Sequence, residues 1–223
     1  MIPARYQASR FPGKLMQDLG GQTVILRTYK ATVASGLFED VFVVTDSAII
    51  FKEITAHGGK AIMSIKDHQC GSDRIAEAVA NMDIDIVVNV QGDEPFTNKE
   101  ALVTLLDVFK AADVSKIDLA SLMVKITDWD EINNPNTVKV ALSNTNKALY
   151  FSRSEIPNNF TLNNQDFYRH IGIYAYKKAT LDRLTNLPMS ALEEAEKLEQ
   201  LRFIENGFTI QASIYNAEIP SGI

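Results

Sequence analysis

The stretch DIVVNVQGDEP, residues 85–95, decides the fold class of the chain. After Asp85 it contains a run of branched apolar residues interrupted by one asparagine, a pattern typical of a strand that is buried on both faces. Such strands belong to parallel sheets that helices cover on both sides. The run ends in polar residues, so we expect a carboxylate, Asp93, at the carboxyl end of the strand, where α/β sheets bind ligands.

The segments around this stretch alternate between strand-like and helix-like patterns. Short β-branched runs predict strands, and apolar residues at helical spacing followed by glycine predict helices. We expect strands at 1–4, 41–45, 60–64 and 85–91, and helices at 23–36, 49–59, 73–82 and 99–112. This alternation continues to about residue 115 and indicates an α/β fold with a mostly parallel sheet and helices on both faces.

The pattern changes in the second half of the chain, which is rich in strands. Strand-like runs lie at 119–126, 137–143, 148–154 and 170–176, separated by asparagine-rich polar breaks. Residues 190–207 predict one continuous helix, because Ser190 and Glu193 fit a capping box and Gly207 follows the last turn. We therefore expect a single domain over residues 1–223, with a β-rich insert at about 126–165.

Composition excludes several classes of protein. The 223 residues carry 22 basic and 28 acidic side chains, for a net charge of −6, which argues against a broad nucleic-acid surface. The single cysteine, Cys70, excludes an internal disulfide and fits a reducing compartment. No apolar run reaches the roughly 18 residues of a membrane span, and the first residues do not resemble a signal peptide. We expect a cytoplasmic protein without a membrane or nucleic-acid partner.

Positive charge is concentrated near the start of the chain. The stretch RYQASRFPGK, residues 5–14, contains Arg5, Arg10 and Lys14 together with a glycine, although the chain as a whole is acidic. Arginine and lysine side chains and the amide of a flexible glycine suit phosphate oxygens, so we expect a triphosphate-sized anion here. The stretch is not a Walker A loop, since it lacks the GxxxxGK[ST] pattern. A solvated basic turn is the alternative.

Two further polar stretches follow predicted strands. In QGDEP, residues 91–95, Asp93 is the natural ligand for Mg²⁺, which takes few carboxylates and completes its shell with water and substrate phosphates. We expect Gly92 to leave room for the ligand, while an ordinary turn is the alternative. In KDHQCGSDR, residues 66–74, neutral donors and acceptors and one cation suit the edge of a nucleotide base; these are Gln69, Gly71, Ser72 and Arg74. Ser72 is alternatively only a helix N-cap.

Seven motifs, taken in order, resemble one known family. They are IPARYQASRFPGK (2–14), DHQCGSDR (67–74), VNVQGDEP (88–95), NPNTVKVAL (134–142), ALYFSR (148–153), RHIGIYAY (169–176) and LEQLRFIENG (198–207). Together they resemble the cytidylyltransferases that activate 3-deoxy-manno-octulosonate (KDO), the CMP-KDO synthetases. The resemblance implies a Rossmann-like nucleotidyltransferase that transfers CMP from CTP to KDO for lipopolysaccharide biosynthesis, with Mg²⁺ and release of pyrophosphate.

The resemblance also implies roles for individual residues. Arg5, Arg10 and Lys14 would hold the triphosphate, and Arg10, Lys14 and Asp93 would be catalytic, with Asp93 as the metal ligand. Gln69, Gly71, Ser72 and Arg74 would surround cytosine and ribose. The sugar would meet Gln91, Arg153, His170, Tyr174, Glu199 and Gln200, with Arg153 as the partner of its carboxylate. A solvated helix face is the alternative for Glu199, and a packed core histidine is the alternative for His170.

Some positions depart from the family pattern. Cys70 and Asp73 stand where the family usually has serine and glutamate, and after IPSGI the family continues into an aspartate that is a second metal ligand. The expected reaction is an in-line displacement at the α-phosphorus, governed by positioning and charge neutralisation. The resemblance further implies a homodimer formed through the region 126–165. An 8-amino KDO analogue or another sugar acid remains an alternative acceptor, and a non-catalytic nucleotide-binding homologue is the other alternative.

Overall fold

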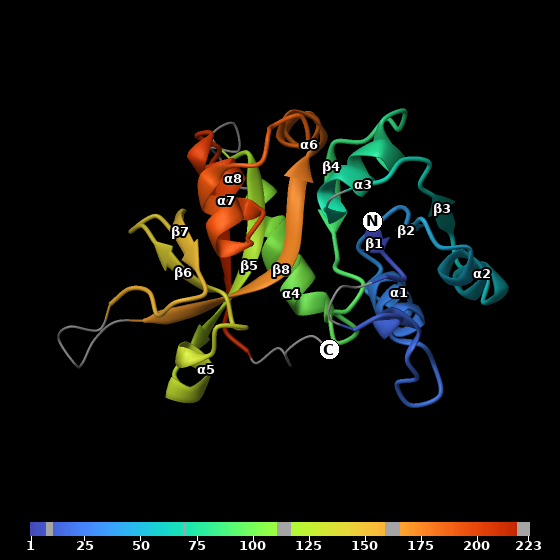
Figure 1. Ribbon diagram of the computed structural model, residues 1–223, viewed down its shortest axis with the longest axis horizontal. Helices are drawn as coiled ribbons and strands as arrows, with labels where there is room; N and C mark the ends of the chain where they lie inside the picture. Colours follow the sequence, from blue (N-terminus) through green and yellow to red (C-terminus); the bar gives the residue numbers. More distant parts are fainter. Residues whose placement is uncertain (8–10, 69, 111–116, 159–165, 218–223) are drawn as a thin grey trace. The chain divides into compact units, whose positions relative to one another are not determined.

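The computed structural model describes residues 1–7, 11–68, 70–110, 117–158 and 166–217, and Figure 1 traces their elements. The chain forms two compact units, Met1–Val103 and Thr104–Glu218. The helix α4 (Lys99–Asp107) and the short 3-10 helix η2 (Val108–Lys110) carry the chain from the first unit into the second. The expectation of one domain with an insert at about 126–165 stays a prediction.

The first unit is built on short parallel strands. They are β1 (Ile2–Ala4), β2 (Val43–Thr45) and β3 (Ala61–Met63), paired in the order β1-β2-β3. Strand β4 (Ile86–Asn89) leads to Val90, whose amide donates to the carbonyl of Met1 at 3.0 Å. Strand β1 therefore has β2 on one side and the β4 segment on the other. The predicted parallel arrangement of the first half is confirmed.

The helices of the first unit begin within two residues of where the sequence predicts. They are α1 (Val24–Ala34), α2 (Ala48–Ala56) and α3 (Gly71–Val79), and the 3-10 helix η1 (Lys14–Met16) precedes them. The side chains of Thr23 and Ser47 cap α1 and α2 by accepting from amides in the first turn. Helices α1 and α2 lie on one face of the strands and α3 on the other, as Figure 1 shows. Helices on both faces are thus confirmed.

The second unit contains a mostly antiparallel sheet. Its strands are β5 (Leu119–Ile126), β6 (Lys139–Leu142), β7 (Ala148–Ser152), β8 (Phe167–Lys177) and β9 (Ile210–Tyr215), in the order β7-β6-β8-β5-β9. Strand β5 runs antiparallel to β8 and parallel to β9. Four of these strands were predicted, and β9 was missed.

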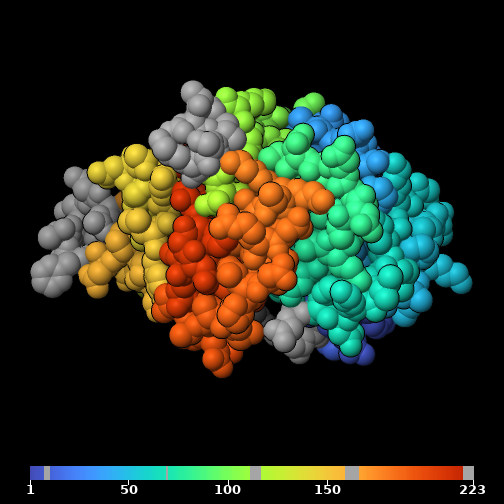
Figure 2. All heavy atoms as spheres, turned by 90° about the horizontal axis from the view of Figure 1, so that it is seen from above, coloured from blue at the N-terminus to red at the C-terminus, as the bar shows by residue number. Residues whose placement is uncertain are grey.

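The helices of the second unit correct one prediction. They are α5 (Trp129–Asn133), α6 (Lys178–Leu184), α7 (Ala191–Glu196) and α8 (Gln200–Glu205). The capping box of Ser190 and Glu193 is confirmed, but the single helix over 190–207 is wrong. Lys197 adopts a left-handed conformation with φ 56° and ψ 46°, which ends α7 and leaves Leu198 buried before α8 begins. In Figure 2 the red helices α7 and α8 lie beside the yellow β6–β7 region.

Both units have dense apolar interiors. The strands of the first unit contribute fully buried aliphatic side chains, as does β5 of the second, and such side chains each stabilise a fold by about 1.5–3 kcal/mol. They include Ile2, Val43, Val44, Leu119 and Leu122. Among the described residues, no helix is both long and apolar enough to cross a membrane.

Candidate active site

The first unit has a topological switch point beside β1. The chain leaves β1 toward β2 on one side, while the β4 segment lies on the other side, and ligands of open α/β sheets bind at the carboxyl ends of strands at such a point. Lys14 follows β1 and Asp93 follows β4. Lys14 Nζ lies 2.6 Å from Asp93 Oδ2, with the side chains 22% and 38% exposed. The structure thus brings together two of the predicted catalytic residues at a site that solvent reaches.

A turn ending in glycine sets the position of Lys14. Gly13 has φ 71°, in the left-handed region that a glycine adopts without strain, and its amide donates to the carbonyl of Tyr6 at 2.8 Å. This hydrogen bond closes the loop after β1 and starts η1 at Lys14. Arg10, the third predicted catalytic residue, lies outside the described residues.

Gly92 has a different role from the one predicted. A Cβ at this position would lie 3.1 Å from the carbonyl oxygen of Pro3 and 3.2 Å from a methyl of Leu15, so protein rather than ligand occupies the space. The hydroxyl of Thr28 donates to the carbonyl of Gly92 at 2.9 Å. Gly92 therefore lets the loop carrying Asp93 pack closely against β1 and α1, which fixes the carboxylate at the switch point.

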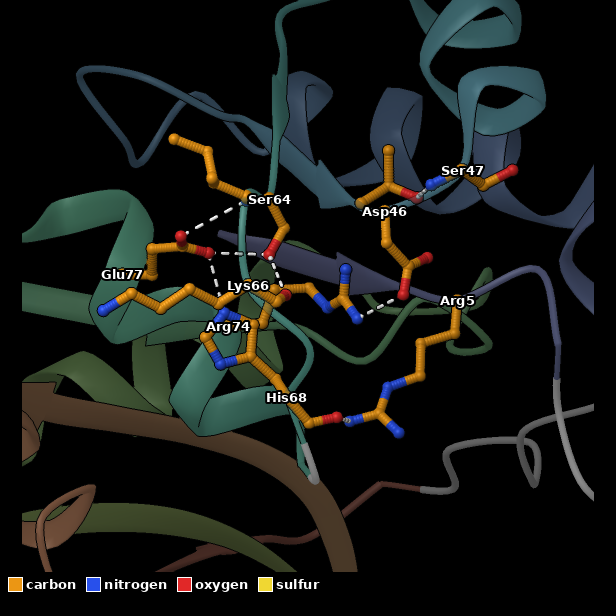
Figure 3. A network of polar contacts seen from close by, with 10 residues as sticks. Arg5, Asp46, Ser47, Ser64, Lys66, His68, Arg74 and Glu77 are labelled. Carbon is orange, nitrogen blue, oxygen red and sulfur yellow. Dashed lines mark hydrogen bonds and ion pairs between the residues drawn. The ribbon is translucent and has the colours of Figure 1, made fainter.

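The loop after β3 is held by the half-buried carboxylate of Glu77, as Figure 3 shows. Glu77 of α3 accepts hydrogen bonds from Ser64 Oγ at 2.7 Å, the Ile65 amide at 3.2 Å and His68 Nε2 at 2.7 Å. Burial by itself would raise the pKa of Glu77, but these hydrogen bonds outweigh it and lower the pKa to about 2. The segment 64–68 is thereby tied to α3.

The same network orients Arg5. Its guanidinium donates to the backbone carbonyl of His68, so the cation after β1 is held by the loop after β3 (Figure 3). Gly71 begins α3, and a Cβ there would lie 3.1 Å from the ring of Pro3. Close packing of this helix start against β1 explains the glycine. Gln69, predicted to read the base, lies outside the described residues.

Arg74 is the most unusual charged group in the first unit. The residue is 1% exposed, and its Nη2 donates to Asp46 Oδ2 at 2.6 Å. Its Nε and Nη1 atoms are buried and have no hydrogen-bond partner within the described ranges. Buried N–H groups that lack an acceptor are costly, so this guanidinium suits a ligand that supplies one. Ser72 is also buried, at the second position of α3, and Cys70 takes the N-cap position instead.

Asp93 fits a metal that is held by few protein ligands. Within the described part of the chain, no group of three or more His, Cys, Asp or Glu side chains is placed to bind a metal. One partly exposed carboxylate beside a lysine is a poor all-protein cage. It is instead the kind of donor set that suits Mg²⁺, which keeps water and phosphate ligands in addition to one or two carboxylates.

In the second unit the structure fixes Arg153 at the end of β7. Its Nε donates to the carbonyl of Glu196 at 2.9 Å and its Nη1 to the carbonyl of Pro135 at 3.0 Å. The Glu196 carboxylate accepts from the Arg153 amide at 3.0 Å and from Ser152 Oγ at 2.7 Å. Backbone carbonyl oxygens thus hold the guanidinium in one orientation. In these contacts the Glu196 carboxylate bonds to the backbone amide of Arg153 and not to its guanidinium.

The other predicted sugar-binding residues of this unit gather around His170. Tyr174 Oη donates to Gln200 Oε1 at 3.2 Å, and Gln200 Nε2 lies 3.5 Å from His170 Nδ1. Burial lowers the pKa of His170 to about 3, so the imidazole is neutral at pH 7. Glu199 occupies the N-cap position of α8, next to Gln200. In the first unit, Gln91 Nε2 donates to Asn89 Oδ1 at 3.4 Å.

Sequence reasoning missed several residues that hold these groups. Asp46, His68 and Glu77 support the first unit's site, and Ser121 contacts His170 in the second. Asp46 stands directly after a strand, at the edge where ligands bind, and this position was a usable signal. Ser121 is a single hydroxyl inside the apolar run LASLMVKI, which was a second signal.

Comparison with known proteins decides the family. The profile described as Cytidylyltransferase matches residues 1–212 of the chain. The chain belongs to the cytidylyltransferase family. A relative from Flavobacterium johnsoniae, named 3-deoxy-manno-octulosonate cytidylyltransferase, is 62% identical over 215 residues, covering 95% of this chain and 87% of the relative.

Two further known proteins are similar to this chain. A protein from Shewanella pealeana named 8-amino-3,8-dideoxy-manno-octulosonate cytidylyltransferase is 40% identical over 224 residues, covering 99% of this chain and 91% of the relative. A solved structure described as CMP:2-keto-3-deoxy-manno-octonic acid synthetase complexed with CTP superposes with a TM-score of 0.92. It is 37% identical and covers 100% of this chain and 90% of its own. The predicted nucleotidyltransferase fold is confirmed.

Proposed function

We propose that this protein transfers CMP from CTP to KDO, giving CMP-KDO and pyrophosphate. The observation that carries the proposal is the pairing of Lys14 with Asp93 at the switch point of the parallel strands. A cation and a metal-binding carboxylate at 2.6 Å form a compact site for a triphosphate and its divalent ion. The 62% identical relative named for KDO supports the choice of acceptor.

The first unit supplies the nucleotide contacts. Arg5, Arg10 and Lys14 bind the triphosphate of CTP, where their charges offset the charge that builds on the departing pyrophosphate. Arg74 donates its unsatisfied N–H groups to the nucleotide, together with Gln69, Gly71 and Ser72. Desolvated donors of this kind reject ligands that lack the matching acceptor, because the buried N–H groups would then stay unpaired.

Mg²⁺ is the metal that Asp93 would hold, and when bound it supplies charge neutralisation and orientation of the phosphates. The protein's own contribution is to fix the Asp93 carboxylate through the packing of Gly92 against β1. Lys14 lies beside that carboxylate and holds a positive charge where phosphate oxygens would bind. No protein nucleophile is required, so Cys70 has no role in the chemistry.

The second unit supplies the sugar contacts. The guanidinium of Arg153, held by two backbone carbonyls, pairs with the carboxylate of KDO. Tyr174, Glu199 and Gln200 serve the hydroxyl groups of the sugar, and His170 acts with them through its contact with Gln200. Gln91 is a further sugar contact. The anomeric hydroxyl attacks the α-phosphorus in line with the leaving pyrophosphate, so the rate depends mainly on how well these groups position the reactants.

The Shewanella relative motivates a second candidate acceptor. That protein is named for the 8-amino analogue of KDO, and it is 40% identical to this chain over nearly its full length. The two sugars differ at one group, whereas the carboxylate and the anomeric hydroxyl are shared. The greater identity to the relatives named for KDO, 62% and 57%, favours KDO.

The experiment is a pyrophosphate-release assay with CTP and Mg²⁺ and three acceptors: KDO, its 8-amino analogue and sialic acid. We expect kcat/KM to be highest for KDO. Turnover of the 8-amino analogue alone would replace the acceptor in this proposal, and binding of CTP without turnover of any sugar acid would favour the non-catalytic alternative.

We also propose an assembly and a location for the protein. We expect a homodimer formed through the region 126–165, which lies within the second unit and contains β6 and β7. Sedimentation as a monomer at micromolar concentration would contradict it. A cytoplasmic location fits the use of CTP and a sequence with a single cysteine, Cys70.

A further inference from the structure

A serine in the interior of β5 is connected to the sugar-binding residues of β8 and α8. Ser121 is 0% exposed, and its hydroxyl lies 2.8 Å from His170 Nε2 and 2.9 Å from the carbonyl oxygen of Ile173. The register between β5 and β8 shifts next to this residue, since Ser121 pairs with Tyr174 whereas Leu122 pairs with Ile171. The irregularity turns the Ile173 carbonyl toward the serine, and β-bulges commonly re-aim groups beside active sites.

The contacts of Ser121 determine which way its proton points. A carbonyl oxygen is only an acceptor, and the hydroxyl lies 2.9 Å from that of Ile173 and 3.4 Å from that of Ile171, so its single hydrogen points to the carbonyl side, with Ile173 the nearer partner. The serine oxygen is then an acceptor toward His170, and the imidazole must donate from Nε2. Because the imidazole is neutral, its other nitrogen, Nδ1, carries a lone pair.

The tautomer of His170 in turn acts on Gln200. An Nδ1 lone pair accepts only from a donor, so the Gln200 amide must present its nitrogen, at 3.5 Å, and not its oxygen. Tyr174 Oη donates to the amide oxygen at 3.2 Å and favours the same orientation. The ring of His170 is further held by Phe151, with centroids 5.0 Å apart. The four hydrogen bonds thus form one consistent chain, in which each group donates to the next from Tyr174 or Gln200 toward the Ile173 carbonyl without two donors or two acceptors facing each other.

We infer that Ser121 is a positioning residue, which fixes His170 as the Nε2-protonated tautomer and thereby sets the orientation of the Gln200 amide. Both ring nitrogens of His170 are engaged with the protein in this arrangement. Gln200 retains one amide hydrogen and one oxygen lone pair beyond these contacts, a defined donor and acceptor for neighbouring hydroxyls. The effect on the sugar rests on the function proposed above, whereas the tautomer does not.

The tautomer is tested directly by nitrogen-15 NMR of the histidine ring nitrogens in the wild-type protein. The protein contains three histidines, and a His170→Asn variant assigns the relevant signals. We expect Nε2 of His170 to resonate as a protonated nitrogen and Nδ1 as an unprotonated one. The opposite assignment in the wild type would overturn the inference whatever the variants do.

Variants then test the role of the hydroxyl. Ser121→Ala should remove the preference for the Nε2–H form and raise the KM for KDO by about threefold to tenfold, with the KM for CTP unchanged. Ser121→Thr keeps the hydroxyl and should retain the wild-type spectrum and KM. Ser213→Ala is the matched control, since Ser213 of β9 is 3% exposed and its hydroxyl has no partner among the residues described.

The outcomes separate this inference from the proposed function. A Ser121→Ala variant with the wild-type spectrum and an unchanged KM for KDO would overturn the positioning role. An equal change in Ser213→Ala would assign the effect to lost packing and also overturn it. If no sugar acid is turned over by the wild type, the proposed function fails while the spectrum still decides the tautomer.

Discussion

Replacing Asp93 by asparagine should separate the chemistry of this site from the stability of the fold. The carboxylate pairs with Lys14 at 2.6 Å, but the two side chains are 38% and 22% exposed. Ion pairs that water reaches contribute only about 0.2–1 kcal/mol to stability. The substitution preserves side-chain size and leaves Gly92, which packs against β1, unchanged. We therefore expect the free energy of unfolding of Asp93→Asn to change by less than about 1 kcal/mol.

The effect on the reaction should be far larger. The lost charge acts where the pyrophosphate develops negative charge, and a preorganised electrostatic contact of this kind is worth about 2.7–4 kcal/mol, or roughly a hundredfold to a thousandfold in rate. Asp40→Asn is the matched control, since Asp40 also pairs with a lysine, Lys60, in the same unit, and its side chain is 46% exposed against 38% for Asp93. It should change the rate less than about twofold.

The assays are pyrophosphate release at saturating CTP and KDO over a range of Mg²⁺ concentrations, and urea unfolding of the same preparations. Unchanged turnover of Asp93→Asn at saturating Mg²⁺ would refute the assignment of Asp93, and Glu94 would be the next residue to test. A large loss of stability in Asp93→Asn would instead mean that the Lys14–Asp93 contact holds the fold together.

Other predictions concern stability. Glu77→Gln should destabilise the protein by on the order of 2 kcal/mol at pH 7. Because the pKa of Glu77 is about 2 in the fold and 4.5 ordinarily, the greater stability of the wild type should be lost as the pH falls from about 4.5 toward 2. A difference in unfolding free energy between wild type and variant that stayed constant over this pH range would argue against the hydrogen-bond network of Glu77. Lys139→Met should lower the unfolding free energy measured in urea by about 3 kcal/mol. The side chain of Lys139 is buried, and its Nζ donates to the backbone carbonyls of Asn134, Thr137 and Arg153 at 2.6–2.8 Å. A decrease of less than about 1 kcal/mol would contradict this prediction. Lys197→Gly should raise the unfolding free energy by up to about 1 kcal/mol by relieving φ 56°, whereas Lys197→Ala should give no gain.

The alternation of strands and helices in the first unit was predictable because it follows from local patterns. Short apolar runs predicted β2, β3 and β4, and glycine or a capping residue marked the ends of the helices. The pairing of Lys14 with Asp93 was predictable only as a shared location, since both follow strands that end at one edge of the sheet. Their contact at 2.6 Å depends on the packing of Gly92 and on the turn at Gly13.

What the sequence did not predict depends on contacts between distant segments. The capping box and helix-forming residues after Ser190 favour one helix, but tertiary packing buries Leu198 and forces Lys197 into a left-handed turn. Strand β9 carries a weak pattern of its own and forms beside β5, which lies about ninety residues earlier in the chain. The contact between Ser121 and His170 depends on the shifted register of β5 and β8, which cannot be predicted from the local sequence pattern.

The most direct test of the central claim is to follow the phosphate atoms of CTP during a single turnover with KDO and Mg²⁺. CTP labelled at the α-phosphorus should transfer its label to a CMP-sugar, and CTP labelled at the β- and γ-phosphorus should release it as pyrophosphate. Label from the α-phosphorus that appeared as free CMP, or that stayed in CTP when active protein and KDO were both present, would contradict the account.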